Sequence, residues 1–278
     1  MGADFTVNYE CQPKLALGDK DMQRGTASIL AMLKARNRAQ AIGDLQREAG
    51  KDPREAKVTV VLRTPQGEKH QEVSYGEMMA SAEPLSRHEA ACAGCPANFL
   101  RTGFGCFGYL NYPVSADFER WLVDRLQPVD APGGFLLQSA IKDFGYDGAP
   151  ISRMRAAGMF ELKTPPEKVI QKKLFGSSKV NGNQLFQALF QVGPALEPSH
   201  CVMILFWLGA LEIEGRAPKT IADLPLVQAT MAASTPEARR ATARLIAGFD
   251  DQTAQHGRAM ITALYQAWVL GVPLLMDA

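Results

Sequence analysis

The sequence predicts a mixed α+β fold that is mainly helical. Three observations support this prediction: an alternating, β-branched start at Phe5–Cys11, a second alternating stretch at Lys57–Val73 that turns back on itself, and a helical spacing of apolar residues from Gln184 onward. We therefore expect a small N-terminal β-sheet or hairpin, a metal-binding loop, and an all-helical C-terminal half.

The N-terminal part contains the clearest local signals. Apolar residues on one stripe predict a helix over 26–49, and the stretch after it predicts a β-hairpin whose turn is Pro65–Gly67. Ser74 and Glu77 have the spacing of a capping box, so a helix should begin directly after Ser74. A second capped helix is expected over 115–126.

The C-terminal part is divided by proline and glycine. A boundary near Pro150 would separate an α+β part, 1–150, from a helical part, 151–278, although one continuous domain fits the sequence equally well. Expected helices lie around 135–144 and 151–160, and then at 184–192, 199–212, 235–248 and 251–270.

Composition limits the classes of function. The net charge is +1, with 30 basic and 29 acidic residues, so no general field exists to hold nucleic acid or an anionic membrane. The most basic run, Lys168–Leu174, is interpreted as a solvated helix face. The longest apolar run, Cys201–Leu211, is shorter than the roughly 20 residues that cross a bilayer, and the start has no signal-peptide pattern. We expect a soluble protein of the cytoplasm.

Three of the five cysteines lie close together in the sequence. His88, Cys92, Cys95 and Cys106 have the pattern H-x3-C-x2-C-x10-C, and an odd number of cysteines without an export signal favours reduced thiols. If the helix after Ser74 continues this far, His88 and Cys92 lie one turn apart on the same face. The sequence therefore predicts a metal site with these four ligands.

The four ligands suit two occupants. Zinc accepts three cysteines and a histidine in closed tetrahedral sites, and it is the preferred prediction. A 4Fe-4S cluster is the alternative, because aromatic residues around Cys106 could form its apolar pocket. The segment His88–Cys95 resembles the histidine-ligated cluster motif of the large iron–sulfur subunit of respiratory complex I; the resemblance covers these residues alone, and Cys106 lies further along than the fourth ligand of that motif.

Other interpretations of the cysteines remain open. Cys92 and Cys95 could be a redox dithiol, although such pairs usually open a helix and this pair is expected to close one. They could also be buried thiols that act as small hydrophobic residues. An open catalytic zinc site with Glu89 or Asp117 as general base is a lower-ranked alternative. Cys11 and Cys201 are interpreted as packing residues.

No motif identifies an enzyme. The sequence has no G-x-S-x-G, no Walker loop and no G-x-G-x-x-G after a strand, so whether the protein is an enzyme stays open. The expected function is a zinc-binding protein of structural or interaction type, with another protein as partner. A redox sensor or an electron-transferring enzyme component is the alternative. The aromatic residues near the motif would form core or a partner-facing surface; they are Phe104, Phe107, Tyr109 and Tyr112.

Overall fold

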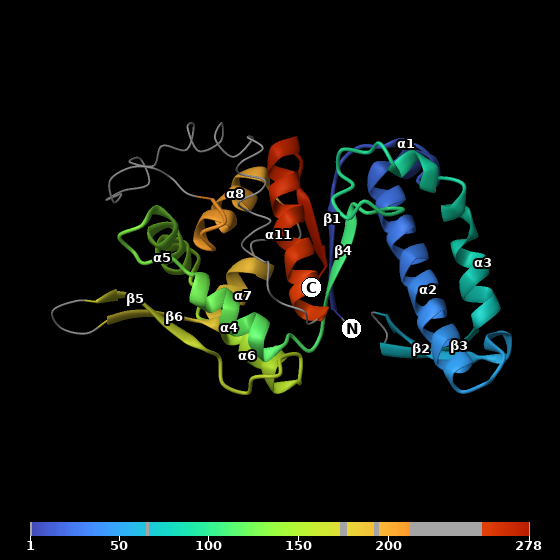
Figure 1. The fold of residues 1–278 in the computed structure, drawn as a ribbon, viewed down its shortest axis with the longest axis horizontal. Helices are drawn as coiled ribbons and strands as arrows, with labels where there is room; N and C mark the ends of the chain where they lie inside the picture. Colours follow the sequence, from blue (N-terminus) through green and yellow to red (C-terminus); the bar gives the residue numbers. More distant parts are fainter. Residues whose placement is uncertain (1, 65–66, 173–176, 192–194, 212–251, 278) are drawn as a thin grey trace. The chain divides into compact units, whose positions relative to one another are not determined.

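Figure 1 shows a computed structural model of the chain as two compact units of mixed α and β structure. Unit 1 comprises 1–9, 96–101 and 105–278, and unit 2 comprises 10–95 and 102–104. The expected division into 1–150 and 151–278 coincides with neither unit. The structure describes residues 2–64, 67–172, 177–191, 195–211 and 252–277.

Unit 1 is built around a four-stranded antiparallel sheet with the order β4-β1-β8-β7. The first strand of the chain is therefore central, and its Phe5 faces Gly108 on one side and Met276 on the other. The ring of Phe5 packs against Gly108 and stacks on the ring of Phe99, with 6.1 Å between centroids, and is almost fully buried. The strands are β1 (Gly2–Val7), β4 (Phe107–Asn111), β7 (Ala195–Leu196) and β8 (Leu274–Asp277).

Helices supply most of the remaining core of unit 1. Helix α11 packs on β4, β1 and α8, while α6 and α4 pack on α7 (Figure 1). Ser115 caps α4 by accepting a hydrogen bond from the backbone N–H of Phe118, as the sequence pattern predicts. The helices are α4 (Ala116–Arg125), α5 (Pro132–Phe144), α6 (Ala149–Ala156), α7 (Gly182–Gln191), α8 (Pro198–Trp207) and α11 (Gln252–Leu270).

The prediction of an all-helical C-terminal half is wrong. The chain forms a hairpin of β5 (Glu167–Lys172) and β6 (Ser177–Asn181), and it returns to the sheet with β7 and β8. The described part of the basic run, interpreted from the sequence as a helix face, lies instead in β5, where Ile170 is buried and Lys168 donates to the carbonyl of Asp124. Strands as short as β7 and β8 give no periodic signal in a sequence. The expected helix at 235–248 lies outside the described residues.

Unit 2 follows the sequence prediction closely. The hairpin forms, and Ser74 and Glu77 make the capping box: the Ser74 side chain accepts from the N–H of Glu77, and the Glu77 carboxylate accepts from the N–H of Ser74. Pro84 lies within the helix that follows. The elements are α1 (Gln12–Leu17), α2 (Met22–Glu48), the 3₁₀ turn η1 (Pro53–Glu55), β2 (Lys57–Thr64), β3 (Gly67–Ser74), α3 (Tyr75–Ser86) and the 3₁₀ turn η2 (Glu89–Cys92).

None of the described helices of either unit is both long and apolar enough to cross a membrane.

Candidate metal centre

The loop His88–Cys95 of unit 2 is wound more tightly than the sequence predicts. Helix α3 ends at Ser86, so the expected helical continuation through Cys92 is wrong, and the chain instead enters η2 with His88 as its N-cap. Successive turns follow, in which the N–H of Ala91 donates to the carbonyl of His88 and the N–H of Cys95 donates to the carbonyl of Cys92 at 3.2 Å. These short turns keep Cys92 and Cys95 in one compact loop.

His88 contacts Cys92 through its backbone. The thiol of Cys92 donates to the carbonyl oxygen of His88 at 3.9 Å, a weak bond typical of sulfur. The imidazole makes no capping hydrogen bond to η2. The contact between these two residues is thus made by the backbone of His88 and does not involve its ring nitrogens.

Cys92 is buried, and its surroundings shift the pKa of its thiol in opposite directions. Burial raises the pKa of its thiol, the backbone N–H of Phe104 donates to the sulfur and lowers it, and negative charge on Cys11, Cys95 or Glu89 raises it further. An N–H donor aimed at a sulfur favours the thiolate, which is the form that binds metals. Without a metal, the net effect keeps this thiol protonated.

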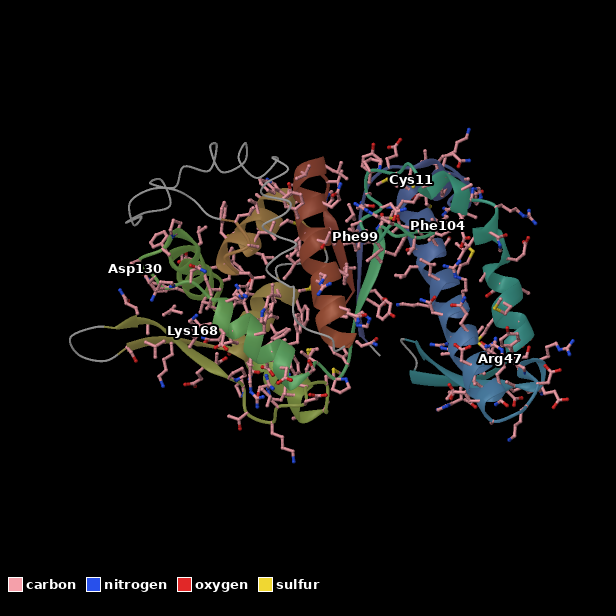
Figure 2. All side chains as sticks on the ribbon, viewed as in Figure 1. Cys11, Arg47, Phe99, Phe104, Asp130 and Lys168 are labelled. Carbon is pink, nitrogen blue, oxygen red and sulfur yellow. The ribbon has the colours of Figure 1, made fainter. Side chains whose placement is uncertain are left out.

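Cys11, interpreted from the sequence as a packing residue, is partly exposed in the structure. It directly precedes α1, and its thiol is close enough to Cys92 for the two to interact electrostatically. Figure 2 labels Cys11 at the start of α1 and Phe104 in the loop that includes 102–104. Because Cys11 is distant from Cys92 in the sequence, no ligand spacing could have indicated it.

Glu89 holds the cysteine loop on the long helix of unit 2. Its carboxylate forms an ion pair with Arg36 of α2, and both side chains are partly exposed. A Cβ on Gly103 would lie 3.0 Å from the carboxyl carbon of Glu89, so the segment 102–104 approaches this carboxylate closely. Glu89 therefore has a positioning partner, and Asp117, the other candidate general base, pairs with Arg120 on the surface of α4.

Cys106 belongs to unit 1. It immediately precedes β4, its side chain is buried, and its carbonyl accepts a hydrogen bond from the N–H of Val7 at 3.0 Å. His88, Cys92 and Cys95 belong to unit 2, so the inclusion of Cys106 in the ligand set rests on sequence spacing. Among the described residues, no group of three or more histidine, cysteine or acidic side chains has the arrangement of a formed metal site.

The aromatic residues near the motif divide between core and surface. Phe104 and Phe107 are buried, whereas Tyr109 is partly exposed and packs its ring on His256 of α11 at 4.4 Å between centroids. Burial raises the pKa of Tyr112 to about 12. Two of the four residues, Phe104 and Phe107, therefore belong to the core, and Tyr109 lies at the surface.

Cys201 shows how a purely structural cysteine looks in this protein. Its side chain is fully buried in α8, its thiol donates to the carbonyl of Leu196 at 3.6 Å, and burial raises its pKa to about 12. The interpretation of Cys201 as a packing residue is confirmed. Cys92 differs because other thiols lie near it.

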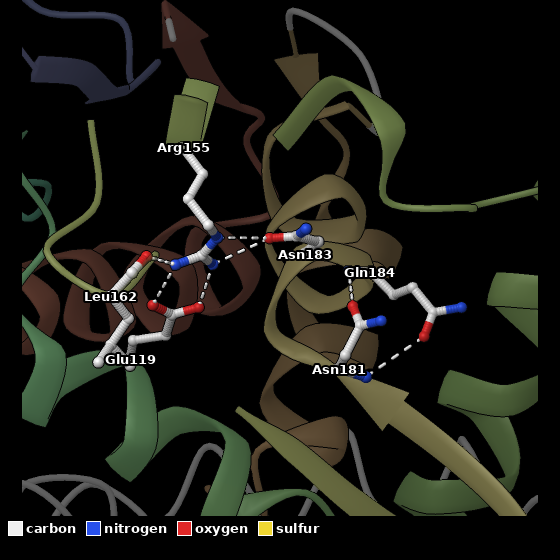
Figure 3. A network of polar contacts seen from close by, with 6 residues as sticks. All are labelled: Glu119, Arg155, Leu162, Asn181, Asn183 and Gln184. Atoms are coloured by element: carbon white, nitrogen blue, oxygen red, sulfur yellow. Dashed lines mark hydrogen bonds and ion pairs between the residues drawn. The ribbon is translucent and has the colours of Figure 1, made fainter. Parts of the chain in front are cut away.

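The sequence analysis also missed the principal buried ion pair of unit 1. Figure 3 shows the guanidinium of Arg155 between the carboxylate of Glu119 and the side-chain oxygen of Asn183, with a further bond to the carbonyl of Leu162. The ring of Phe160 covers the guanidinium at 4.5 Å. The network joins α4, α6 and α7, and every hydrogen-bonding group of the arginine is used, so it is a structural element.

Comparison of the chain with protein-family models, with curated proteins and with solved structures gives no match. The candidate centre is therefore argued from its own residues.

Proposed function

We propose that the protein binds one zinc ion through His88, Cys92, Cys95 and Cys106, and that the metal stabilises a protein of structural or interaction type. The observation that supports this most is the turn from Cys92 to Cys95, together with the backbone N–H that Phe104 donates to the sulfur of Cys92. A C-x2-C turn with N–H···S bonds is a frequent arrangement of zinc thiolates.

The burial of Cys92 explains why a metal would matter there. A buried thiolate without a counter-charge is unfavourable, so the thiol keeps its proton in the absence of metal. A divalent cation replaces that proton and compensates the charge of the sulfur. Zinc binding at this loop should therefore release protons and contribute to the folding free energy of unit 2.

An iron–sulfur cluster is the second candidate, and one observation favours it. Cys92 and Phe104 are both buried, and apolar burial with N–H···S bonds is the environment in which proteins hold such clusters and tune their potential. The function would then be redox sensing or electron transfer. In either case we place the protein in the reducing cytoplasm, where thiols persist, and we propose another protein as its partner.

The test is metal analysis of anaerobically purified, untagged protein, combined with an absorption spectrum. Zinc at about one per chain without colour supports the first proposal. Iron with acid-labile sulfide and a broad absorption that bleaches on reduction supports the second. Protein that contains no metal and takes up neither zinc nor iron with sulfide contradicts both.

Variants then assign the site. Cys95→Ser should remove the metal and lower the stability of unit 2, because the binding energy of a structural site is folding energy. Cys201→Ala is the matched control, since that cysteine already has a backbone acceptor and a packing role in unit 1. Loss of the metal from Cys95→Ser with an unchanged melting temperature would contradict a structural role.

A further inference from the structure

We propose that Cys92 and Cys95 form a disulfide when the protein is oxidised, and that this disulfide excludes the metal from the loop. The pair is then a thiol switch: the reduced form supplies two of the proposed ligands, and the oxidised form supplies neither. Formation of the disulfide is argued from the geometry of the turn alone, whereas exclusion of the metal rests on the proposed function. Both residues belong to unit 2.

The turn from Cys92 to Cys95 has the dimensions that a disulfide requires. The N–H of Cys95 donates to the carbonyl of Cys92 at 3.2 Å, and Ala93 between them has φ −60° and ψ −39°. A β-turn of this kind brings its first and last Cα atoms to within about 7 Å. Disulfide-linked Cα atoms lie about 4.4–6.8 Å apart, so the backbone meets the main requirement for this bond.

The two side chains also leave the turn on the same side. The hydrogen bonds of η2 join residues three positions apart, and the loop continues this pattern from Ala90 and Ala93 to Cys92 and Cys95. In 3₁₀ geometry, side chains three positions apart lie one above the other. The Cβ atoms of Cys92 and Cys95 are therefore neighbours, as they must be for their sulfurs to join.

The present contact of the Cys92 thiol with His88 does not oppose the disulfide. The thiol donates to the carbonyl of His88 at 3.9 Å, which is a weak hydrogen bond. The same carbonyl accepts from the N–H of Ala91 at 3.1 Å, so it keeps a partner when the S–H group is lost. Oxidation thus leaves this backbone acceptor satisfied.

The two thiols differ in exposure, which sets the order of the reaction. Cys95 is partly exposed, whereas Cys92 is only 6% exposed. A Cβ on Gly94, between them, would meet nothing within 4 Å among the described residues, so this side of the turn is open to a small molecule. An oxidant in solution therefore meets Cys95 first, and Cys92 is the resolving thiol.

The oxidant is a small-molecule disulfide of the glutathione type. Cys95 gives up its proton, its sulfur attacks the oxidant, the S–S bond of the oxidant breaks, and one glutathione leaves and takes a proton. Cys92 then gives up its proton and attacks the sulfur of Cys95, and the second glutathione leaves as a thiol. In total the protein loses two protons and two electrons, and one glutathione disulfide becomes two glutathione thiols.

The metal and the disulfide exclude each other because they use the same sulfurs. Zinc binds thiolates, and a disulfide contains none, so oxidation of the pair removes two of the four proposed ligands. Conversely, a sulfur that is bound to zinc is less available to attack the oxidant. In a reducing cytoplasm such a disulfide is transient, which is the usual behaviour of a redox sensor.

The first test equilibrates the metal-free, full-length chain anaerobically with mixtures of reduced and oxidised glutathione, blocks the remaining thiols by alkylation and digests the protein with trypsin. Cleavage after Arg87 and Arg101 gives a peptide, 88–101, whose only cysteines are Cys92 and Cys95. We expect this peptide to lose the mass of two hydrogen atoms and to carry no alkyl group. A peptide that is doubly alkylated even in a large excess of oxidised glutathione overturns the inference.

Two variants identify the attacking and the resolving thiol. Cys92→Ser should accumulate a glutathione adduct on Cys95, because no second thiol is left to displace it. Cys201→Ala is the matched control and should form the disulfide as the unaltered chain does, since Cys201 is buried in unit 1. A disulfide that links Cys92 or Cys95 to any other cysteine overturns the inference.

Zinc titration separates this inference from the proposed function. The oxidised chain should take up zinc only after reduction, and zinc-loaded chain should form the disulfide at least about tenfold more slowly than metal-free chain. An oxidised chain that binds zinc as tightly as the reduced chain overturns the inference. A reduced chain that forms the disulfide but never binds zinc contradicts the proposed function instead.

Discussion

The guanidinium of Arg155 in unit 1 and the thiols near Cys92 in unit 2 are both polar centres within folded units, and they differ in how fully they are satisfied. Each of the five N–H groups of Arg155 has an acceptor from Glu119, Asn183 or Leu162. The thiols of Cys11 and Cys95 have no hydrogen-bond partner among the described residues. The first centre therefore stabilises the fold, whereas metal binding at the second is the proposal that the experiments test.

The largest expected effect comes from breaking the saturated network. Arg155→Leu leaves the carboxylate of Glu119, which is 0% exposed, without its counter-charge, and should lower the unfolding free energy of unit 1 by about 3–5 kcal/mol. Urea unfolding followed by tryptophan fluorescence measures this unit alone, because Trp121, Trp207 and Trp268 all lie in unit 1.

The double variant Glu119→Leu with Arg155→Leu is the control for that prediction. Removing both charges should restore much of the lost stability, because an apolar pair carries no desolvation cost. A loss of unfolding free energy below about 1 kcal/mol in the single variant would mean that water hydrates the carboxylate of Glu119. The network would then not be sealed from solvent.

A second comparison uses one glycine from each centre. A Cβ on Gly182 would lie 2.3 Å from the carboxylate oxygen of Glu119, whereas a Cβ on Gly94, between Cys92 and Cys95, would meet nothing within 4 Å. Gly182→Ala should cost about 1–3 kcal/mol through overpacking, and Gly94→Ala should change stability by less than about 0.5 kcal/mol. Chemical denaturation of both variants, with fluorescence for unit 1 and circular dichroism for the helices, gives the two values; equal costs would contradict the contrast.

The contribution of Cys201 to stability should depend on pH, which gives a further test of how a fully buried thiol behaves. Its pKa is raised to about 12 in the folded protein from an ordinary 9.0, so the unfolded chain loses this proton first. The contribution of Cys201 to stability is therefore complete below pH 9.0 and is lost as the pH rises toward about 12.

The measurement for Cys201 is the difference in unfolding free energy between the unaltered chain and Cys201→Ala as a function of pH. That difference should shrink by about 1.4 kcal/mol for each pH unit above the thiol's ordinary pKa, since other titrating groups are common to both proteins. A difference that is constant with pH would show that the thiol is reached by solvent.

The smallest effect is expected at the contact that holds the cysteine loop. Arg36→Gln removes the ion pair with Glu89, whose partners are 24% and 41% exposed, so screening limits the loss of stability to under about 1 kcal/mol. The rate at which a chelator removes zinc should rise, because the loop before Cys92 loses its contact with α2. Metal release followed with a colorimetric chelator checks this; an unchanged rate would show that Glu89 does not position the loop.

The sequence predicted those features that depend on neighbouring residues. The capping box of Ser74 and Glu77, the helix α2 and the hairpin β2–β3 all follow from local patterns, and they form as expected. The turn that holds Cys92 and Cys95 together is equally local. In each case the residues that decide the structure lie within a few positions of one another.

The features that the sequence did not predict depend on residues that are brought together only by the fold. Glu119 and Arg155 lie on different helices, and a charged residue in a helix is ordinarily expected on the surface. Cys11 has no ligand spacing with Cys92, and β8 is too short for alternation to be recognised. Whether a metal binds the predicted ligands is decided by the proposed experiments.

The central position of β1 has a consequence for the order of folding. Its partners β4 and β8 lie after unit 2 in the chain, so this central strand is synthesised before unit 2 and finds its partners only after unit 2 has been made. During synthesis, unit 2 can complete its local contacts while both edges of β1 still lack their strands. Such a strand is a target for unwanted pairing with other chains, so a delay before β4 and β8 become available should favour aggregation of this protein.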